Sequence, residues 1–196
     1  MLNPFWNWWE ENQAHLKDNL NSKSKEKTGI KNKDLLDDLQ QGRRDFHDLT
    51  MKEVNLRGQD LTGVVFVDCE LIGCDLSNAR MINANFSGTS LDRSNITYAH
   101  CDGANFFRSS LYGCNLTGAT LRQCNLTGAN LSETNLSWAD LSNANLTWTR
   151  LSGANLSHAN VEQAALEKAL GKMMTFNAMR LPIGGAIIRR RATNKS

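Results

Sequence analysis

Large apolar residues recur every five positions along most of the chain. All 25 positions from Phe46 to Leu166 in steps of five hold Phe, Met, Leu, Ile, Val or one Cys. The residue two places before each, from Val64 to Ala164, is Ala, Ser, Thr, Cys or Val. With 40% hydrophobic residues, chance would produce such a run with a probability on the order of 10⁻¹⁰. The repeat unit is therefore a small residue, Asn or Asp, Leu, Ser or Thr, and a variable residue.

A period of five fits neither a helix nor a flat strand. Five helical residues turn the chain by about 500°, so no apolar face forms. In a strand, an odd period places successive leucines on opposite faces. A chain that turns a corner after every unit can place one large and one small residue of each unit inward. A second period of twenty predicts four units per square coil and a core column of Phe46, Phe66, Phe86, Phe106, Leu126 and Leu146.

The residue before each leucine predicts two kinds of side for this coil. Asn95, Asn115, Asn135 and Asn155 would stack on one side, and Asn85, Asn105, Asn125 and Asn145 on the opposite side. Stacked amides can hydrogen bond to their neighbours above and below. The other two sides have mixed residues in this slot. We therefore expect function to rest on these two variable sides and on the tails.

Tandem units such as "GANLSETNLSWADLSNANL" resemble the pentapeptide-repeat family. The resemblance covers about residues 44–168. It implies an all-β solenoid, a right-handed quadrilateral β-helix of about six coils and roughly 30 Å in length at the usual β spacing. The end coils would expose unpaired backbone edges, so we expect short helical caps at both ends.

The segments outside the array suggest how it is capped. In residues 34–43 we predict a capping helix with Asp34 as N-cap, Leu35, Leu36 and Leu39 on one face, and Gly42 at its end. After the array, "VEQAALEKALGKMM" returns to helical spacing and is expected to close the last coil. Residues 169–196 would form the end of this cap and a basic tail.

The two ends of the chain each allow two interpretations. Residues 1–20 are rich in aromatic side chains, and residues 21–33 read as a flexible polar linker. The aromatic segment either packs on the solenoid wall or anchors a partner or a membrane surface. The tail with Arg189, Arg190 and Arg191 is either a disordered end or a contact for an acidic partner, a membrane surface or a second subunit. Some family members dimerise through C-terminal elements, which leaves a homodimer open here.

Charge and reactive residues argue against several function classes. Residues 44–168 carry thirteen acids and nine bases, and residues 169–196 carry six bases and no acid. This distribution disfavours a nucleic-acid partner. There is no CxxC pair, and His47, His100 and His158 fall on scattered outward positions, so we expect no metal, no cofactor and no enzyme activity. The five cysteines are expected to be buried, reduced thiols. The N-terminus lacks a secretory pattern, which predicts a cytoplasmic location.

Exposed aromatic residues are the best candidates for a binding site. The candidate partner-binding residues are Tyr98, Phe107, Tyr112, Trp138 and Trp148, together with Arg189, Arg190 and Arg191. Tyr98 and Trp138 would share one side, two coils apart, with a gap at Gly118 that could hold a partner's side chain. The alternative is that these aromatic rings cover neighbouring side chains or pack under a tail.

The function these features favour is a non-enzymatic scaffold that binds an unidentified protein partner. The resemblance implies a second hypothesis, a DNA mimic that modulates a type II topoisomerase such as gyrase. The array's net charge of only −4 and its uninterrupted register weaken this second hypothesis. A third hypothesis is a membrane-associated or secreted effector that uses the Trp-rich head or the Arg-rich tail.

Overall fold

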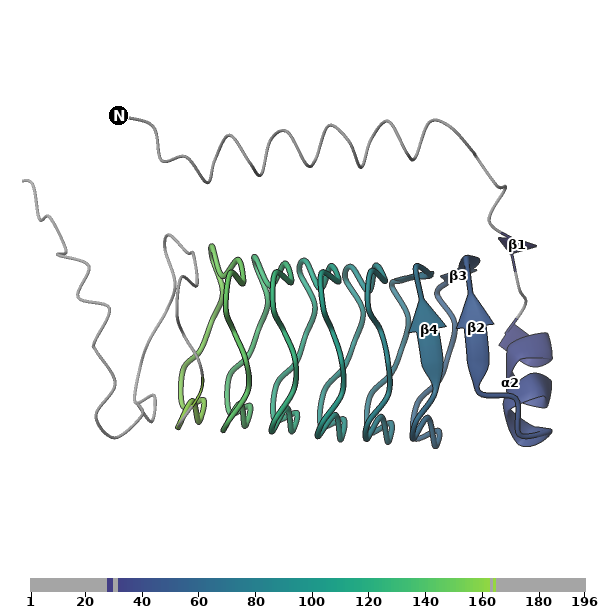
Figure 1. Ribbon diagram of the computed structural model, residues 1–196, viewed down its shortest axis with the longest axis horizontal. Helices are drawn as coiled ribbons and strands as arrows, with labels where there is room; N and C mark the ends of the chain where they lie inside the picture. The colour runs from purple at the N-terminus through teal and green to yellow at the C-terminus, as the bar shows by residue number, and fades with distance from the viewer. Residues whose placement is uncertain (1–27, 30–31, 163, 165–196) are drawn as a thin grey trace, which may run out of the picture.

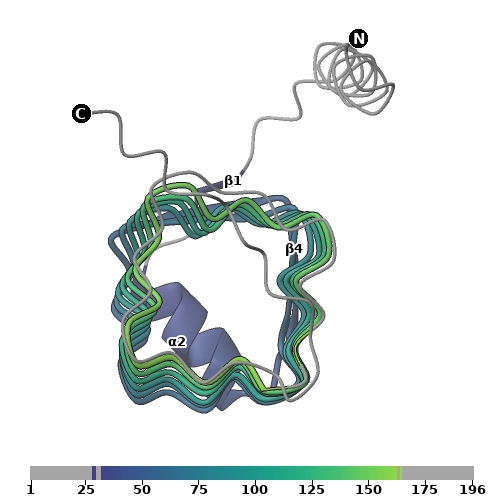
Figure 2. The ribbon, with the colours of Figure 1, turned by 90° about the vertical axis from the view of Figure 1, so that its left-hand side faces the viewer.

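The chain folds as a right-handed quadrilateral β-helix, as the family resemblance implies, with the square coil that the five- and twenty-residue periods predict. The structure is a computed structural model that describes residues 28–29, 32–162 and 164. Seen end-on, successive coils superimpose on one square outline (Figure 2). Helix α2 (Asn32–Gln40) precedes the first coil (Figure 1). The named strands are β1 (Thr28–Gly29), β2 (Asp45–His47), β3 (Leu49–Lys52), β4 (Val65–Val67) and β5 (Glu70–Ile72).

All strand pairing is parallel and joins residues of successive coils. The strands form two sheets, with order β1-β3-β5 and β2-β4. Beyond them the ladder continues as single bridges between residues twenty apart, such as Asn95 with Asn115. The Leu116 N–H donates to the Asn135 carbonyl at 2.7 Å, and the Asn135 N–H donates to the Cys114 carbonyl at 3.0 Å. Strands are short because part of every five-residue unit is spent in the corner.

The core is a set of columns that run along the axis. Phe46, Phe66, Phe86 and Phe106 stack with ring centroids 5.0, 5.7 and 5.3 Å apart. Leu126 and Leu146 continue the column, and all six side chains are fully buried. The small residue of each unit is also buried, which lets the backbone of each side approach the large side chains.

The fifth residue of each unit forms the corner and has a positive φ. Fourteen non-glycine residues have φ between 53° and 62°. At one corner the Gln59 N–H donates to the Leu56 carbonyl at 3.1 Å, and Gly58 has φ 65°. A type II turn requires a positive φ at this third position. Glycine and asparagine adopt this backbone most readily, so a bulky residue at a corner is unfavourable for the backbone.

Helix α2 lies across the N-terminal end of the stack (Figures 1 and 2). It begins at Asn32, so the prediction that Asp34 is the N-cap is wrong: Asp34 lies in the first turn. Leu35 and Leu39 are buried in the same cluster as the array core. The helix ends in a Schellman motif, in which the Arg43 N–H donates to the Asp38 carbonyl at 2.9 Å and Gly42 has φ 85°.

The predicted linker contains an ordered pair. Thr28–Gly29 pairs with Leu49 and Thr50 of β3, because the first coil leaves a free backbone edge on this side. The aromatic segment 1–20, the tail 169–196 and most of the predicted C-terminal closing helix lie outside the described residues. The prediction that this helix begins at Val161 is wrong, because the Asn143 N–H donates to the Glu162 carbonyl at 2.9 Å and the Ala164 N–H donates to the Val161 carbonyl at 3.1 Å, as in the other repeat units.

Candidate partner-binding surface

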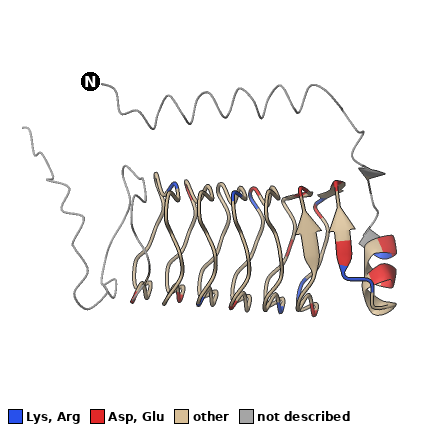
Figure 3. Cartoon of the chain, viewed as in Figure 1, with Lys and Arg blue, Asp and Glu red and all other residues tan. Residues whose placement is uncertain are grey.

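One side of the coil differs from the others in its charge. We call it the Tyr98 face, and it consists of residues 54–58, 74–78, 94–98, 114–118, 134–138 and 154–158. Among these described residues the only Asp, Glu, Lys or Arg side chains are Arg57 and Asp75. From residue 76 onward the face therefore carries no charge other than any on His158. Elsewhere, charges of both signs recur on α2 and along the coils (Figure 3).

Asparagine amides hold the flat part of this face in place. The Asn155 Nδ2 donates to Asn135 Oδ1 at 3.3 Å. Each asparagine Oδ1 also accepts the backbone N–H two residues later, as in Thr117 N to Asn115 Oδ1 at 3.1 Å. The Thr117 hydroxyl donates to the same Asn115 oxygen at 2.7 Å. The result is a rigid, polar and uncharged surface.

Two large aromatic side chains rise from this surface. Tyr98 is 60% exposed and Trp138 is 64% exposed. The Trp138 ring stacks on His158 with centroids 4.1 Å apart and planes 8° apart. The Tyr98 ring lies against Gly118, where an added Cβ would be 2.5 Å from Tyr98 Cε1. Each aromatic ring therefore leans onto the next coil.

This lean corrects one prediction. The expected gap between Tyr98 and Trp138 at Gly118 does not exist, because the Tyr98 ring occupies it. The reason is general: corner side chains lean toward the following coil, and a glycine there offers no side chain to oppose them. Glu133 lies over Gly153 in the same way. The surface is a ridge of rings rather than a notch.

The backbone conformation at these two corners does not favour a bulky side chain. Tyr98 has φ 55° and Trp138 has φ 62°. A residue with a Cβ in this region costs on the order of 1–2 kcal/mol relative to glycine. Neither ring is buried, so core packing does not offset this cost. Bulky aromatic residues at exposed positive-φ corners indicate a role at the surface.

The other predicted aromatic residues do not join this site. Phe107 is 36% exposed and Tyr112 is 39% exposed, and they lie on two other sides. The Arg108 guanidinium lies 4.9 Å from the Phe107 ring centroid. Trp148 is half-buried at a corner of the opposite side. Phe107 and Trp148 share that opposite side two coils apart, but Phe107 is only 36% exposed and Trp148 is half-buried. Arg189, Arg190 and Arg191 lie outside the described residues, and among the five described candidates Tyr98 and Trp138 are the two that share a corner column and are more than half exposed.

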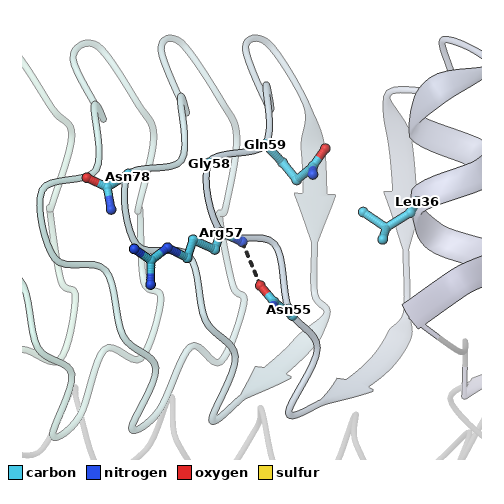
Figure 4. A pocket seen from close by; sticks show the side chains of 6 residues that line it. All are labelled: Leu36, Asn55, Arg57, Gly58, Gln59 and Asn78. Carbon is cyan, nitrogen blue, oxygen red and sulfur yellow. Dashed lines mark hydrogen bonds between the residues drawn. The ribbon is translucent and has the colours of Figure 1, made fainter.

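Sequence reasoning missed a groove at the N-terminal end of the same face. This open groove of about 700 Å³ is lined by Leu36, Asn55, Arg57, Gly58, Gln59 and Asn78 (Figure 4). Arg57 is exposed, and its backbone N–H donates to Asn55 Oδ1 at 3.0 Å. Burial acts to raise the pKa of Asp75, but hydrogen bonds from Ser77 and the charge of Arg57 lower it overall. The sequence feature that could have indicated the groove is Arg57, the one Lys or Arg side chain among the described residues of the Tyr98 face.

The described residues form no cluster of metal-ligating side chains. Among residues 28–29, 32–162 and 164, no three His, Cys, Asp or Glu side chains gather in a way that could hold a metal ion. The five cysteines are free thiols, as predicted, and all are buried. Burial raises the pKa of Cys114 and of Cys124 to about 12. Within the same residues no helix is long and apolar enough to cross a membrane.

Comparison with known proteins identifies the repeat. A family model described as pentapeptide repeats, in eight copies, matches residues 50–88, 74–111, 109–147 and 139–170. These matches together span more than half of the chain. No curated protein matches it.

Several solved structures are similar to this chain, and HetL, which has a TM-score above 0.5, supports the same fold. HetL is a pentapeptide repeat protein involved in heterocyst differentiation regulation from the cyanobacterium Nostoc sp. strain PCC 7120. It is 18% identical with a TM-score of 0.54, over 76% of this chain and 91% of HetL. A pentapeptide repeat protein of the Arabidopsis thaliana thylakoid lumen is 31% identical with a TM-score of 0.46, over 55% of this chain and 68% of that one. QnrB1, a plasmid-mediated fluoroquinolone resistance protein, is 16% identical with a TM-score of 0.42, over 69% and 83% of the two chains.

Proposed function

The chain belongs to the pentapeptide-repeat family, and on that premise we propose that it is a non-enzymatic scaffold that binds a protein partner through the Tyr98 face. The observation that carries this proposal is the exposure of Tyr98 and Trp138, at 60% and 64%, on the part of this face that has no Asp, Glu, Lys or Arg from residue 76 onward. Tyrosine and tryptophan are the residue types that most often dominate binding energy at protein interfaces. A surface that is already ordered loses little conformational entropy when a partner binds.

The charge pattern favours this function over a DNA mimic that modulates a type II topoisomerase. A mimic of the DNA backbone needs acidic side chains in regular, unpaired rows. The array has a net charge of only −4. Some of its acids are neutralised locally, as in the ion pair between Arg122 Nε and Asp140 Oδ2 at 2.7 Å. The described coils also run without a loop insertion.

Other predictions depend on residues outside the described ranges. A membrane-associated or secreted effector role would use the Trp-rich head or Arg189, Arg190 and Arg191. A homodimer, a contact between the termini and a membrane surface, and a cytoplasmic location all remain predictions.

The test compares two matched double variants. Tyr98→Asn with Trp138→Asn removes both rings and keeps residues that tolerate a positive φ, since Asn78 occupies the same corner column at φ 56°. The control, Phe107→Thr with Tyr112→Ser, removes two exposed rings from other sides and uses residues found in their columns, Thr127 and Ser132. Circular dichroism and thermal unfolding first establish that both variants keep the fold.

The readout is affinity capture from a lysate of the source organism, followed by mass spectrometry. We expect the wild-type protein and the control to recover the same partner, and the Tyr98/Trp138 variant to lose it. Undiminished capture by the Tyr98/Trp138 variant, or equal loss by the control, contradicts the proposal.

A further inference from the structure

We propose that the Tyr98 face binds a proline-rich segment in the polyproline II conformation, with one acidic residue at the end that meets Arg57. This inference rests on the proposed function, because it specifies the chemistry of the protein partner. It is carried by the spacing, the chemistry and the charge of three features on the same face.

The three features are evenly spaced. The corners at Gly58, Tyr98 and Trp138 follow one another at intervals of two coils, since each bridge joins residues one coil apart. At about 4.8 Å per coil, each interval is about 9.6 Å. A polyproline II helix has three residues per turn and a rise of 3.1 Å, so it repeats about every 9.3 Å. Ligand residues i, i+3 and i+6 therefore stay in register with the Gly58 corner beside Arg57, with Tyr98 and with Trp138.

Other extended or helical partners match this face less well. A β-strand repeats on one face about every 6.6 Å, which misses the interval. Strand addition is also excluded, because the backbone groups of this side are already paired between coils. In an α-helix, seven residues advance about 10.5 Å, so over two intervals the mismatch grows to about 2 Å. An amphipathic helix also needs a continuous apolar stripe for residues i, i+3, i+4 and i+7, whereas this surface is polar between the rings.

The surface chemistry suits a polyproline II ligand. Such ligands dock on exposed aromatic rings, and their backbone carbonyls stay free to accept hydrogen bonds. Tyr98 offers a hydroxyl and Trp138 an indole N–H beside these carbonyls. Thr97, Thr117 and Ser137 line the same strip and are partly exposed. The Thr97 and Thr117 hydroxyls donate to the Asn95 and Asn115 Oδ1 atoms at 2.9 and 2.7 Å, so they present acceptor oxygens to a ligand. Because the ligand conformation is already stiff, little entropy is lost on docking.

Charge sets the composition and the direction of the ligand. From residue 76 onward the face offers no Asp, Glu, Lys or Arg in the described coils, so charged ligand side chains would find no partner there. Arg57, exposed in the groove of Figure 4, is the one Lys or Arg side chain among the described residues of this face, and Asp75 on the next coil is its one carboxylate. An acidic residue three positions from the nearer proline would pair with it. An exposed pair of this kind adds little affinity and mainly fixes orientation.

The test is fluorescence anisotropy with labelled peptides whose cores are DAAPAAP and its reverse, PAAPAAD. We expect one orientation to bind the full-length protein. Trp138→Asn and Tyr98→Asn should each weaken binding by about tenfold or more, and Phe107→Thr should leave it unchanged. Moving the second proline by one position, as in DAAPAAAP, should weaken binding to a similar extent. Replacing the peptide's Asp by Lys should weaken binding a few-fold, and Arg57→Glu should reverse that preference.

Several results would overturn the inference. These are the absence of binding up to about 1 mM peptide, or binding that ignores proline spacing, or binding that ignores both rings. Binding of a neutral oligosaccharide or an amphipathic helical peptide in place of the proline peptide would also overturn it. If lysate capture still requires Tyr98 and Trp138 while no proline peptide binds, this inference fails and the scaffold function stands.

Discussion

The phenylalanine column offers a direct test of how the coils hold together. Phe86 is fully buried, and its ring centroid lies 5.7 Å from that of Phe66 and 5.3 Å from that of Phe106. Phe86→Ala removes both stacking contacts and leaves a cavity that the square backbone cannot collapse to fill. Buried Phe→Ala substitutions cost about 3–5 kcal/mol. We expect the free energy of unfolding to fall by that amount.

Phe86→Leu is the matched control, because Leu126 and Leu146 occupy the same column in later coils. A hydrophobic replacement of this kind usually costs less than about 1.5 kcal/mol. For a chain of this size, about 1 kcal/mol shifts Tm by roughly 2–4 °C. Thermal unfolding followed by circular dichroism should therefore show a fall of about 6–20 °C for Phe86→Ala and at most about 6 °C for Phe86→Leu. Equal shifts for the two variants would refute a close-packed column at this position.

Three further predictions concern a corner, a thiol and an ion pair. Gly118→Ala should lower the free energy of unfolding, measured with urea, by about 1–2 kcal/mol. This loss should exceed that of Gly63→Ala, because of these two positions only Gly118 has a ring in contact with the new Cβ. Equal losses would contradict this prediction. Because burial raises the pKa of Cys114 to about 12, a thiol reagent at pH 8 should label it only after denaturation, and rapid native labelling would contradict the burial. Burial acts to raise the pKa of Asp140, but hydrogen bonds from Arg122 and Ser142 lower it overall. The contribution of ionised Asp140 to the free energy of unfolding is therefore complete above the unfolded pKa of about 3.9, and it is lost as the pH falls through the lower folded pKa. Asp140→Asn should reduce the fall of the urea unfolding midpoint with decreasing pH. An unchanged fall would contradict this prediction.

The architecture could be predicted because it is periodic. A five-residue spacing excludes helix and flat strand, and the twenty-residue column from Phe46 to Phe106 sets four units per coil. Each coil repeats the same local choice, so the pattern of one unit predicts the whole stack. The first residue of α2 was predicted less well, because fraying and capping decide it locally.

The shape of the candidate site could not be predicted from the period alone. The sequence places Tyr98 and Trp138 in one column, but it does not show that corner side chains lean toward the next coil and that the Tyr98 ring covers Gly118. The groove at Arg57 depends on where α2 places Leu36. Both features follow from three-dimensional positions that a repeat pattern does not encode.

The proposed binding surface does not lie on the sides where the residue before each leucine varies. Variation in the residue before each leucine suggested that function rests on the two variable sides. Tyr98 and Trp138 instead lie on one of the asparagine sides, where the described coils carry almost no charge. The proposal therefore rests on the charge and the exposed aromatic residues of a whole side, and not on variation in the residue before each leucine.

Footprinting of a captured complex tests the proposed binding surface most directly. The free protein and the complex are exposed to hydroxyl radicals, and oxidation of each aromatic residue is measured by mass spectrometry. Tyr98 and Trp138 should be protected in the complex, while Phe107 and Tyr112 are oxidised as in the free protein. Protection of Phe107 and Tyr112 with undiminished oxidation of Tyr98 and Trp138 would place the partner on another side and contradict the account.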